Sequence, residues 1–545
     1  MFDNNTYNPY YKNYSNYYLT TMYGTLFKGR IICYDIPIET SYELNNGKYL
    51  HFYISYMNNI IEIFPLIGET THIPQMTNSY YIINNYIIKN LNRSLIIYPF
   101  SQNLADSFEE IYLLELKKIE KNEVIKLRKE NKEYNNSRKK AQIWLLNDRK
   151  NQAGDNGEYF FRYLNTLKPK GIKYYFVVEE NSLDAIRLKN YENIVYYNSS
   201  EYLNLFLKAD KIISSISDSW VYNPFGNDGK LLNDLFHFDF IYLNNGIIKD
   251  DLSKYLNKIL KNFKFLVTSS KKEYESILNF NYGYDENNLL LTGMPRFDNL
   301  KKLEMTMKTE KIILIFPTWR SYIKGILDIN TLESIICEKF IFTEFYKFYN
   351  QLINNQQLLD EMDTHNYSGI LCLHPNFAEQ YKFFNENKFF KVNSKCFKQE
   401  ILVRAAILIT DYSSIFFDFA YLKKPIIYSH FDIEEYRKYQ FPKGYFDYKN
   451  DGFGPVCNNL ECTIKNIIEE IKNNCQLKEV YLKRINEYFE FFDDNNNFRI
   501  YKSIKKHTKI KYSFKLFQYI LIFAFLLFTK LIIKKFLFFS KDFEK

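Results

Sequence analysis

Three apolar runs in the second half of the chain end in residues of the kinds that bind phosphate. The run 406–409 leads into Thr410-Asp411-Tyr412-Ser413-Ser414, the run 371–373 leads into His374, and the run 313–316 leads into Pro317-Thr318-Trp319-Arg320. Hydroxyls at a helix N-terminus, an imidazole and a guanidinium all donate hydrogen bonds to phosphate oxygens. Because the carboxyl ends of parallel strands meet at one edge of a sheet, we expect these side chains to converge on a phosphorylated ligand.

Each of these residues has a simpler interpretation when it is taken alone. Ser413 or Ser414 is then more often a helix N-cap, and His374 a structural hydrogen-bonding residue. A single Arg320 on a surface says little about function. Their placement at three strand ends within one half of the chain is what favours a phosphate site.

An alternation of short apolar runs with amphipathic stretches surrounds these segments. Such alternation is typical of an α/β fold with parallel sheets, and two Rossmann-like halves are the simplest account of it. The expected strands are 143–146, 174–178, 211–215, 241–243 and 265–268 in the first half, and 311–316, 370–373, 406–409 and 425–428 in the second.

Two segments precede the first half. Residues 1–105 mix Tyr/Ile-rich runs with Asn clusters, which predicts a β-rich N-terminal accessory module. Residues 106–140 are rich in Glu, Lys and Leu at helical spacing, which predicts a charged helical linker. A solvated linker and a helix that packs on its neighbours both remain open for this segment.

The chain ends in a basic and apolar tail over residues 501–545. Residues 501–515 contain no acid, and the apolar run 516–529 is shorter than the roughly 20 residues that span a bilayer. This pattern predicts a helix that associates with the cytoplasmic face of the membrane, peripherally or as a monotopic anchor. The alternative is a helix packed on the protein's own core.

The composition limits the remaining classes of function. A chain of 545 residues exceeds one hydrophobic core, so two or three domains are expected. The net charge of +9 is modest and partly local to the tail, so no nucleic-acid partner is predicted. The seven cysteines form no CxxC pair and the carboxylates form no tight cluster, so neither a metal nor another cofactor is predicted.

From about Ile143 to about Ile500, a series of ordered motifs resembles the CDP-glycerol glycerophosphotransferase family, the teichoic acid primases and polymerases. The motifs of the second half are 292–298, 317–320, 374–376, 410–414, 418–420, 424–425, 444–448 and 451–456. Those of the first half are 147–149, 153–158, 209–215 and 249–253.

The resemblance implies a GT-B architecture, in which an acceptor domain (141–305) and a CDP-alditol-binding domain (306–500) face a cleft. It implies His374 as a catalytic residue. The donor-binding residues that it implies are Thr318, Arg320, Asn376, Thr410, Asp411, Ser413, Ser414 and Asp418. The acceptor-side residues are Asp155, Asn156, Asp250 and Asp251.

The reaction that the resemblance implies is transfer of glycerol phosphate, or another alditol phosphate, from CDP-glycerol or another CDP-alditol. The acceptor is a hydroxyl of a lipid-linked polymer at the membrane surface. The product is a teichoic-acid-like or capsular phosphopolymer, and CMP is released.

One departure from the family pattern concerns the expected base. Where the family has Gln-His-Gly, this chain reads Asn244-Asn245-Gly246. An Asn side chain forms hydrogen bonds but accepts no proton. His237, Asp250 or Asp251 are candidates to replace the base. The alternatives are a catalytically degenerate transferase that serves as a binding or assembly partner, and a GT-B sugar-nucleotide glycosyltransferase for capsule.

Overall fold

The computed structural model describes residues 15–506 with short gaps. The gaps are residues 22–23, 32–47, 51, 57–58, 64–79, 84–85, 92–93, 137–140, 324, 327–333 and 394–398. The predicted membrane-associating tail lies outside the described residues from residue 507 onward. No helix within the described part of the chain is long and apolar enough to cross a membrane.

The first half is built on a seven-stranded parallel sheet with the order β11-β10-β9-β12-β13-β14-β15. Its strands are β9 (Gln142–Asn147), β10 (Ile172–Val178), β11 (Ile194–Tyr196), β12 (Lys211–Ser214), β13 (Asp239–Tyr242), β14 (Phe265–Thr268) and β15 (Leu289–Leu291). Strands β9, β12 and β14 are mostly apolar and almost wholly buried, because helices cover both faces of a sheet of this kind. The predicted α/β fold with parallel sheets is confirmed.

The second half contains a six-stranded parallel sheet with the order β18-β17-β16-β19-β20-β21. Its strands are β16 (Ile312–Phe316), β17 (Ser368–Cys372), β18 (Phe390–Asn393), β19 (Ile407–Thr410), β20 (Ile426–Ser429) and β21 (Val456–Cys457). Strand β16 pairs with β17 on one side and with β19 on the other. The three strand ends that carry the predicted phosphate ligands are therefore neighbours.

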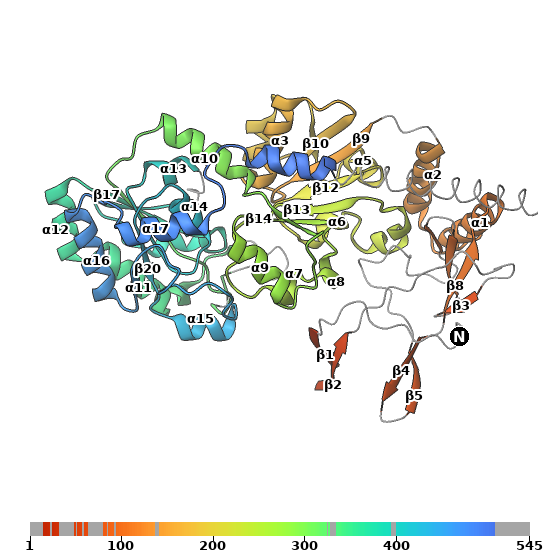
Figure 1. The fold of residues 1–545 in the computed structure, drawn as a ribbon, viewed down its shortest axis with the longest axis horizontal. Helices are drawn as coiled ribbons and strands as arrows, with labels where there is room; N and C mark the ends of the chain where they lie inside the picture. Colours follow the sequence, from red (N-terminus) through yellow and green to blue (C-terminus); the bar gives the residue numbers. More distant parts are fainter. Residues whose placement is uncertain are drawn as a thin grey trace, which may run out of the picture.

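Helices cover these sheets, and Figure 1 shows the two halves side by side. In the first half they are α3 (Asn156–Leu167), α4 (Leu183–Leu188), α5 (Ser200–Leu207), α6 (Ser219–Tyr222), η1 (Gly226–Leu231), η2 (Asn233–Leu235), α7 (Ser253–Leu256), α8 (Lys258–Lys261), α9 (Lys271–Asn279) and α10 (Pro295–Thr306). In the second they are η3 (Glu338–Phe342), α11 (Glu344–Ile353), α12 (Gln356–His365), η4 (Pro375–Phe383), α13 (Gln399–Arg404), α14 (Ile415–Tyr421), α15 (Ile433–Tyr439), α16 (Leu460–Lys472) and α17 (Glu479–Tyr488).

The described residues before residue 100 form antiparallel strands. These are β1 (Ser15–Thr21), β2 (Gly24–Ile31), β3 (Lys48–Leu50), β4 (Phe52–Tyr56), β5 (Asn59–Ile63), β6 (Tyr80–Ile83), β7 (Tyr86–Leu91) and β8 (Ser94–Pro99). They pair as β1-β2, β4-β5 and β3-β8-β7-β6.

The charged segment that follows these strands forms two helices, α1 (Gln102–Lys118) and α2 (Asn122–Asn136). Tyr112 and Leu116 are fully buried in the core of the first half. Arg128 is also buried, and it is hydrogen-bonded to both Glu109 and Asp234. Residues 102–136 are therefore packed against the first half and do not form a solvated linker.

The last described helical segment, residues 496–506, returns from the second half to the first. Its Ile500 and Ile504 are fully buried in one apolar cluster with Trp144 and Phe160. In Figure 1 this dark blue helix lies beside α3. The packing of this segment extends the first half beyond the boundary that sequence order gives.

Candidate active site

A cavity of about 280 Å³ lies between the two halves. The loop after β9 and the loop after β13 line it on one side, and the ends of β16, β17 and β19 line it on the other. The polar residues in its wall include Arg149, Gln152, Asp155, Asn244, Asn245, Lys249, Asp250, Arg296, Thr318, His374, Ser413, Ser414 and Gln440. A cavity at the carboxyl ends of parallel strands is the usual ligand site of such folds.

Four predicted ligand-binding residues of the second half meet in this wall: Thr318, His374, Ser413 and Ser414. Each is half-buried. The Oγ1 atom of Thr318 is buried and has no hydrogen-bond partner within the described part of the chain. A buried hydroxyl without a partner is costly, so Thr318 has a donor left for a ligand.

His374 is held in one tautomer by its surroundings. Its Nδ1 accepts a hydrogen bond from the backbone N–H of Asn376 at 3.1 Å, and its ring stacks on Trp319. Burial, and then the positive charge of Arg149, lower the pKa of His374 to about 3. The ring is therefore neutral near pH 7, and its one N–H proton lies on Nε2. Nε2 can donate a hydrogen bond to a ligand, but it cannot accept a proton from one.

Arg320 does not lie in the wall of the cavity. Its side chain is fully buried, and Nε and Nη2 donate to Asp432 at 2.7 and 2.9 Å. Nη2 also forms an ion pair with Asp411 at 2.9 Å. These two carboxylates occupy the guanidinium that the sequence assigned to phosphate. Asp411 in turn accepts the backbone N–H of Thr318 at 2.8 Å, so Arg320 supports the turn that carries Thr318.

Asn376, Thr410, Asp411 and Asp418, which the sequence also assigned to the donor, lie outside the wall of the cavity, and Asp411 is fully buried. Thr410 is fully buried and its hydroxyl donates to the carbonyl of Phe316 at 2.6 Å. This bond ties the end of β19 to the end of β16. Asn376 and Asp418 contact residues of the wall: the backbone N–H of Asn376 donates to His374, and Asp418 accepts from Arg296.

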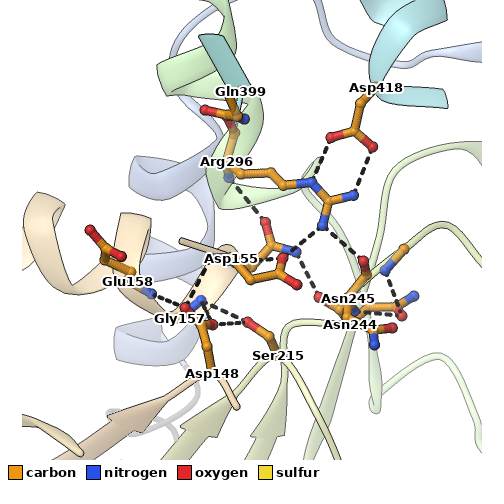
Figure 2. A network of polar contacts seen from close by, with 12 residues as sticks. Asp148, Asp155, Gly157, Glu158, Ser215, Asn244, Asn245, Arg296, Gln399 and Asp418 are labelled. Carbon is orange, nitrogen blue, oxygen red and sulfur yellow. Dashed lines mark hydrogen bonds and ion pairs between the residues drawn. The ribbon is translucent and has the colours of Figure 1, made fainter. Parts of the chain in front are cut away.

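A buried ionic network joins the two halves beside the cavity (Figure 2). Arg296, in the first turn of α10, donates from Nε and Nη2 to Asp418 of α14 at 2.6 and 2.8 Å. Its Nη1 donates to Asp155 at 2.8 Å and to the carbonyl of Asn245 at 3.0 Å. Sequence reasoning did not assign Arg296 a role, although its motif 292–298 stood out.

The loop that carries Asn245 is held by hydrogen bonds to the buried side chains of Asn244 and Glu273. Asn244 has a left-handed backbone (φ 64°), and its Oδ1 accepts the N–H of Asn245 at 2.9 Å. The buried carboxyl of Glu273 accepts the N–H of Ile248 at 2.8 Å, and burial raises the pKa of Glu273 to about 8. The side chain of Asn245, which the resemblance places where the family has its base, is exposed in the cavity wall.

Of the four predicted acceptor-side residues, two line the cavity and two do not. Asp155 and Asp250 line the cavity, whereas Asn156 and Asp251 do not. Asn156 is buried and donates to the carbonyl of Asn244 at 2.6 Å. Asp251 accepts the N–H of Ser253 at 2.9 Å in a local turn just before α7, whose N-cap residue is Leu252.

The candidates for a replacement base are poorly suited to the task. His237 lies at a separate cavity of about 180 Å³, formed with α1 and α2. Burial by itself would raise the pKa of Asp250, but its pairs with Lys249 and, at 2.5 Å, with Arg437 outweigh burial and lower that pKa. A carboxylate whose pKa is lowered in this way is a weaker proton acceptor.

Gly246 brings the first half close to the second half. A Cβ atom at this position would lie 2.2 Å from Oγ of Ser414. We expect Gly246→Ala to reduce the free energy of unfolding by about 1–3 kcal/mol, as overpacking does, and to lower the activity. Denaturant unfolding and initial rates measure the two effects.

The matched test of this contact is the double variant Gly246→Ala/Ser414→Ala, which removes the clashing oxygen. Its loss of stability should be smaller than the sum of the two single losses, because the two residues are in contact. Strict additivity would contradict the close approach of Gly246 and Ser414.

Comparisons with known proteins point to the family that the sequence motifs resemble. Residues 131–506 match the family model described as CDP-glycerol:poly(glycerophosphate) glycerophosphotransferase. The chain is 39% identical over 370 residues to the minor teichoic acid biosynthesis protein GgaB of Bacillus subtilis, which covers 66% of this chain and 39% of that protein. It is 31% identical over 248 residues to the teichoic acid glycerol-phosphate primase of the same organism, which covers 44% of this chain and 57% of that protein.

The chain thus spans less than two thirds of the length of either relative. Among solved structures, a variant of the wall teichoic acid polymerase TagF is similar in fold, with a TM-score of 0.52 at 17% identity. The similarity covers 76% of this chain and 100% of that structure.

Proposed function

The chain belongs to the CDP-glycerol:poly(glycerophosphate) glycerophosphotransferase family, and from this premise we propose that it transfers an alditol phosphate from a CDP-alditol to a hydroxyl of a lipid-linked acceptor. The observation that carries the proposal is the cavity between the halves, where Thr318, His374 and Ser413 meet. CDP-glycerol is the donor that the family description favours.

In the proposed reaction, the acceptor oxygen attacks the β-phosphorus of the donor. The bond from this phosphorus to the oxygen bridging to CMP breaks, and a phosphodiester to the acceptor forms. The acceptor hydroxyl loses its proton to solvent water, and CMP departs with the electron pair of the broken bond. No covalent enzyme intermediate is required.

The residues in the wall have distinct roles in this proposal. The Nε2–H of His374 donates to a diphosphate oxygen, and it needs no change of protonation to do so. The hydroxyl of Thr318 donates beside it, and Ser413 and Ser414 line the wall where α14 begins. Donors fixed before the reaction stabilise the charge that develops on the departing CMP.

The test is CMP release by the purified full-length chain. The chain is mixed with CDP-glycerol or CDP-ribitol and with a lipid-linked acceptor in anionic vesicles. We propose that the chain binds these vesicles through its basic tail and co-sediments with them. CMP should appear with at least one donor, only when acceptor is present. UDP- and GDP-sugars serve as control donors. Turnover of a sugar nucleotide alone would contradict the proposal.

A second candidate function is favoured by Asn245: a member of the family that binds donor or polymer without turning it over. The variant Asn245→His separates the two. If the chain is degenerate, His should raise CMP release from an undetectable level by on the order of 10²–10⁴-fold, the contribution of a general base. If the Asn site is active as it stands, the same variant lowers an activity that is already measurable.

A further inference from the structure

The cations around the cavity differ in how they are neutralised. Lys249 is paired with Asp250, and Arg296 with Asp155 and Asp418. Arg149 also lines the cavity and is half-buried, but its side chain makes no ion pair or hydrogen bond with any residue that the structure describes. One cation in the wall is therefore left to pair with a bound anion.

The position of Arg149 is set by rigid elements. It follows β9, which lies between β10 and β12 in the first sheet. The preceding residue, Asp148, is buried and accepts the backbone N–H groups of Asp155 and Gly157 at 3.0 and 2.8 Å, at the start of α3. The backbone that presents Arg149 is thus fixed.

Arg149 also lies close enough to His374 for its charge to lower the pKa of that ring. His374 belongs to the second half and Arg149 to the first. A phosphate group between them would contact a guanidinium on one side and a neutral N–H donor on the other. An Arg side chain offers paired donors in the geometry that phosphate oxygens accept.

We propose that Arg149 binds non-bridging oxygens of the donor's β-phosphoryl group from the acceptor half, opposite His374. The inference rests on the proposed function and adds to it a residue of the first half that contacts the transferred group. The charge of Arg149 would remain against this group while it moves to the acceptor. A phosphodiester of the acceptor has the same chemistry, and comparison of the nucleotide affinities with the KM for the acceptor distinguishes the two sources.

The experiment is calorimetric titration of the full-length chain and of Arg149→Ala with CMP and with CDP-glycerol. Only CDP-glycerol carries the β-phosphoryl group. The variant should bind CDP-glycerol about 10- to 100-fold more weakly, the usual effect of losing a charged hydrogen bond, and should bind CMP about as tightly as the natural chain. Arg149→Lys should recover only part of the loss, because an ammonium lacks the paired donors.

Lys150→Ala is the matched control. Lys150 is the next residue, and its Nζ lies 4.6 Å from the ring centroid of Tyr197 and 5.5 Å from that of Trp220, outside the wall of the cavity. This variant should bind both nucleotides like the natural chain. Thermal melting of all three variants shows whether each is folded.

Three results would overturn the assignment. Equal weakening of CMP and CDP-glycerol would place Arg149 at the α-phosphate. Unchanged nucleotide binding with a raised KM for the acceptor would place it at an acceptor phosphate. Unchanged binding and kinetics would remove it from phosphate recognition. Failure of the folded natural chain to bind any CDP-alditol is a different result, because it would contradict the proposed function and not only the role of Arg149.

Discussion

Replacing His374 with alanine should lower kcat by about 10²–10³-fold, the effect of removing one donor that stabilises charge in a transition state. The ring donates from Nε2 because Nδ1 is already engaged by the N–H of Asn376. Initial rates of CMP release measure the effect. His374→Asn, which retains an N–H donor, should recover part of the rate.

The pH dependence of the natural chain provides a separate check on His374. Because the pKa of His374 is lowered to about 3, the ring is neutral above that pH and charged only below it. The profile of kcat/KM should therefore show no inflection from this residue between about pH 6 and 8. An acidic inflection in that range that disappears in His374→Asn would show that the ring acts as a base instead.

Replacing Arg296 with alanine should reduce the free energy of unfolding by about 3–5 kcal/mol, the usual cost of removing one partner from a buried ion pair. The change leaves Asp155 and Asp418 buried without their shared cation. It should also lower CMP release, because the carbonyl of Asn245 loses its donor. Denaturant unfolding and initial rates measure the two effects.

Arg404→Ala is the matched control for Arg296. Arg404 makes a similar two-bonded pair with Glu310, at 2.6 and 2.8 Å, but this pair is exposed to solvent. Its loss should change stability little. A further variant, Arg296→Ala/Asp418→Asn, should regain part of the stability lost in Arg296→Ala. Equal losses for Arg296→Ala and Arg404→Ala would contradict the network.

The sheets were predictable because their signal is local. Strands buried on both faces are short apolar runs, and parallel order follows from the helices between them. The meeting of Thr318, His374 and Ser413 was predictable for the same reason: each follows a strand directly, and the three strands are neighbours. Helix α10 begins at Pro295, another local signal.

The direction in which a charged side chain points was not predictable, because its partners lie far away in the sequence. Arg320 pairs with Asp432, 112 positions later, and Arg296 with Asp418, 122 positions later. Nothing near Arg320 or Arg149 in the sequence shows that the first is neutralised, or that the second lines the cavity without an ion-pair partner among the residues that the structure describes. The motif 147–149 marked Arg149 only as part of a resemblance.

The sequence also did not show which segments at the two ends of the α/β region pack on the first half. Helices α1 and α2 have a highly charged sequence, yet Arg128 is buried because Glu109 and Asp234 both accept its hydrogen bonds. The segment 496–506 follows the second half in sequence but packs through Ile500 and Ile504 on the first. The amino-acid composition of these segments predicts neither contact, because both contacts depend on the tertiary arrangement.

A crystal structure of the full-length chain with CDP-glycerol and no acceptor tests the central claim most directly. The diphosphate should lie in the cavity between the halves, with one of its oxygens within about 3.2 Å of Nε2 of His374. A nucleotide bound elsewhere, or a diphosphate in the cavity that leaves His374 without contact, would contradict the account.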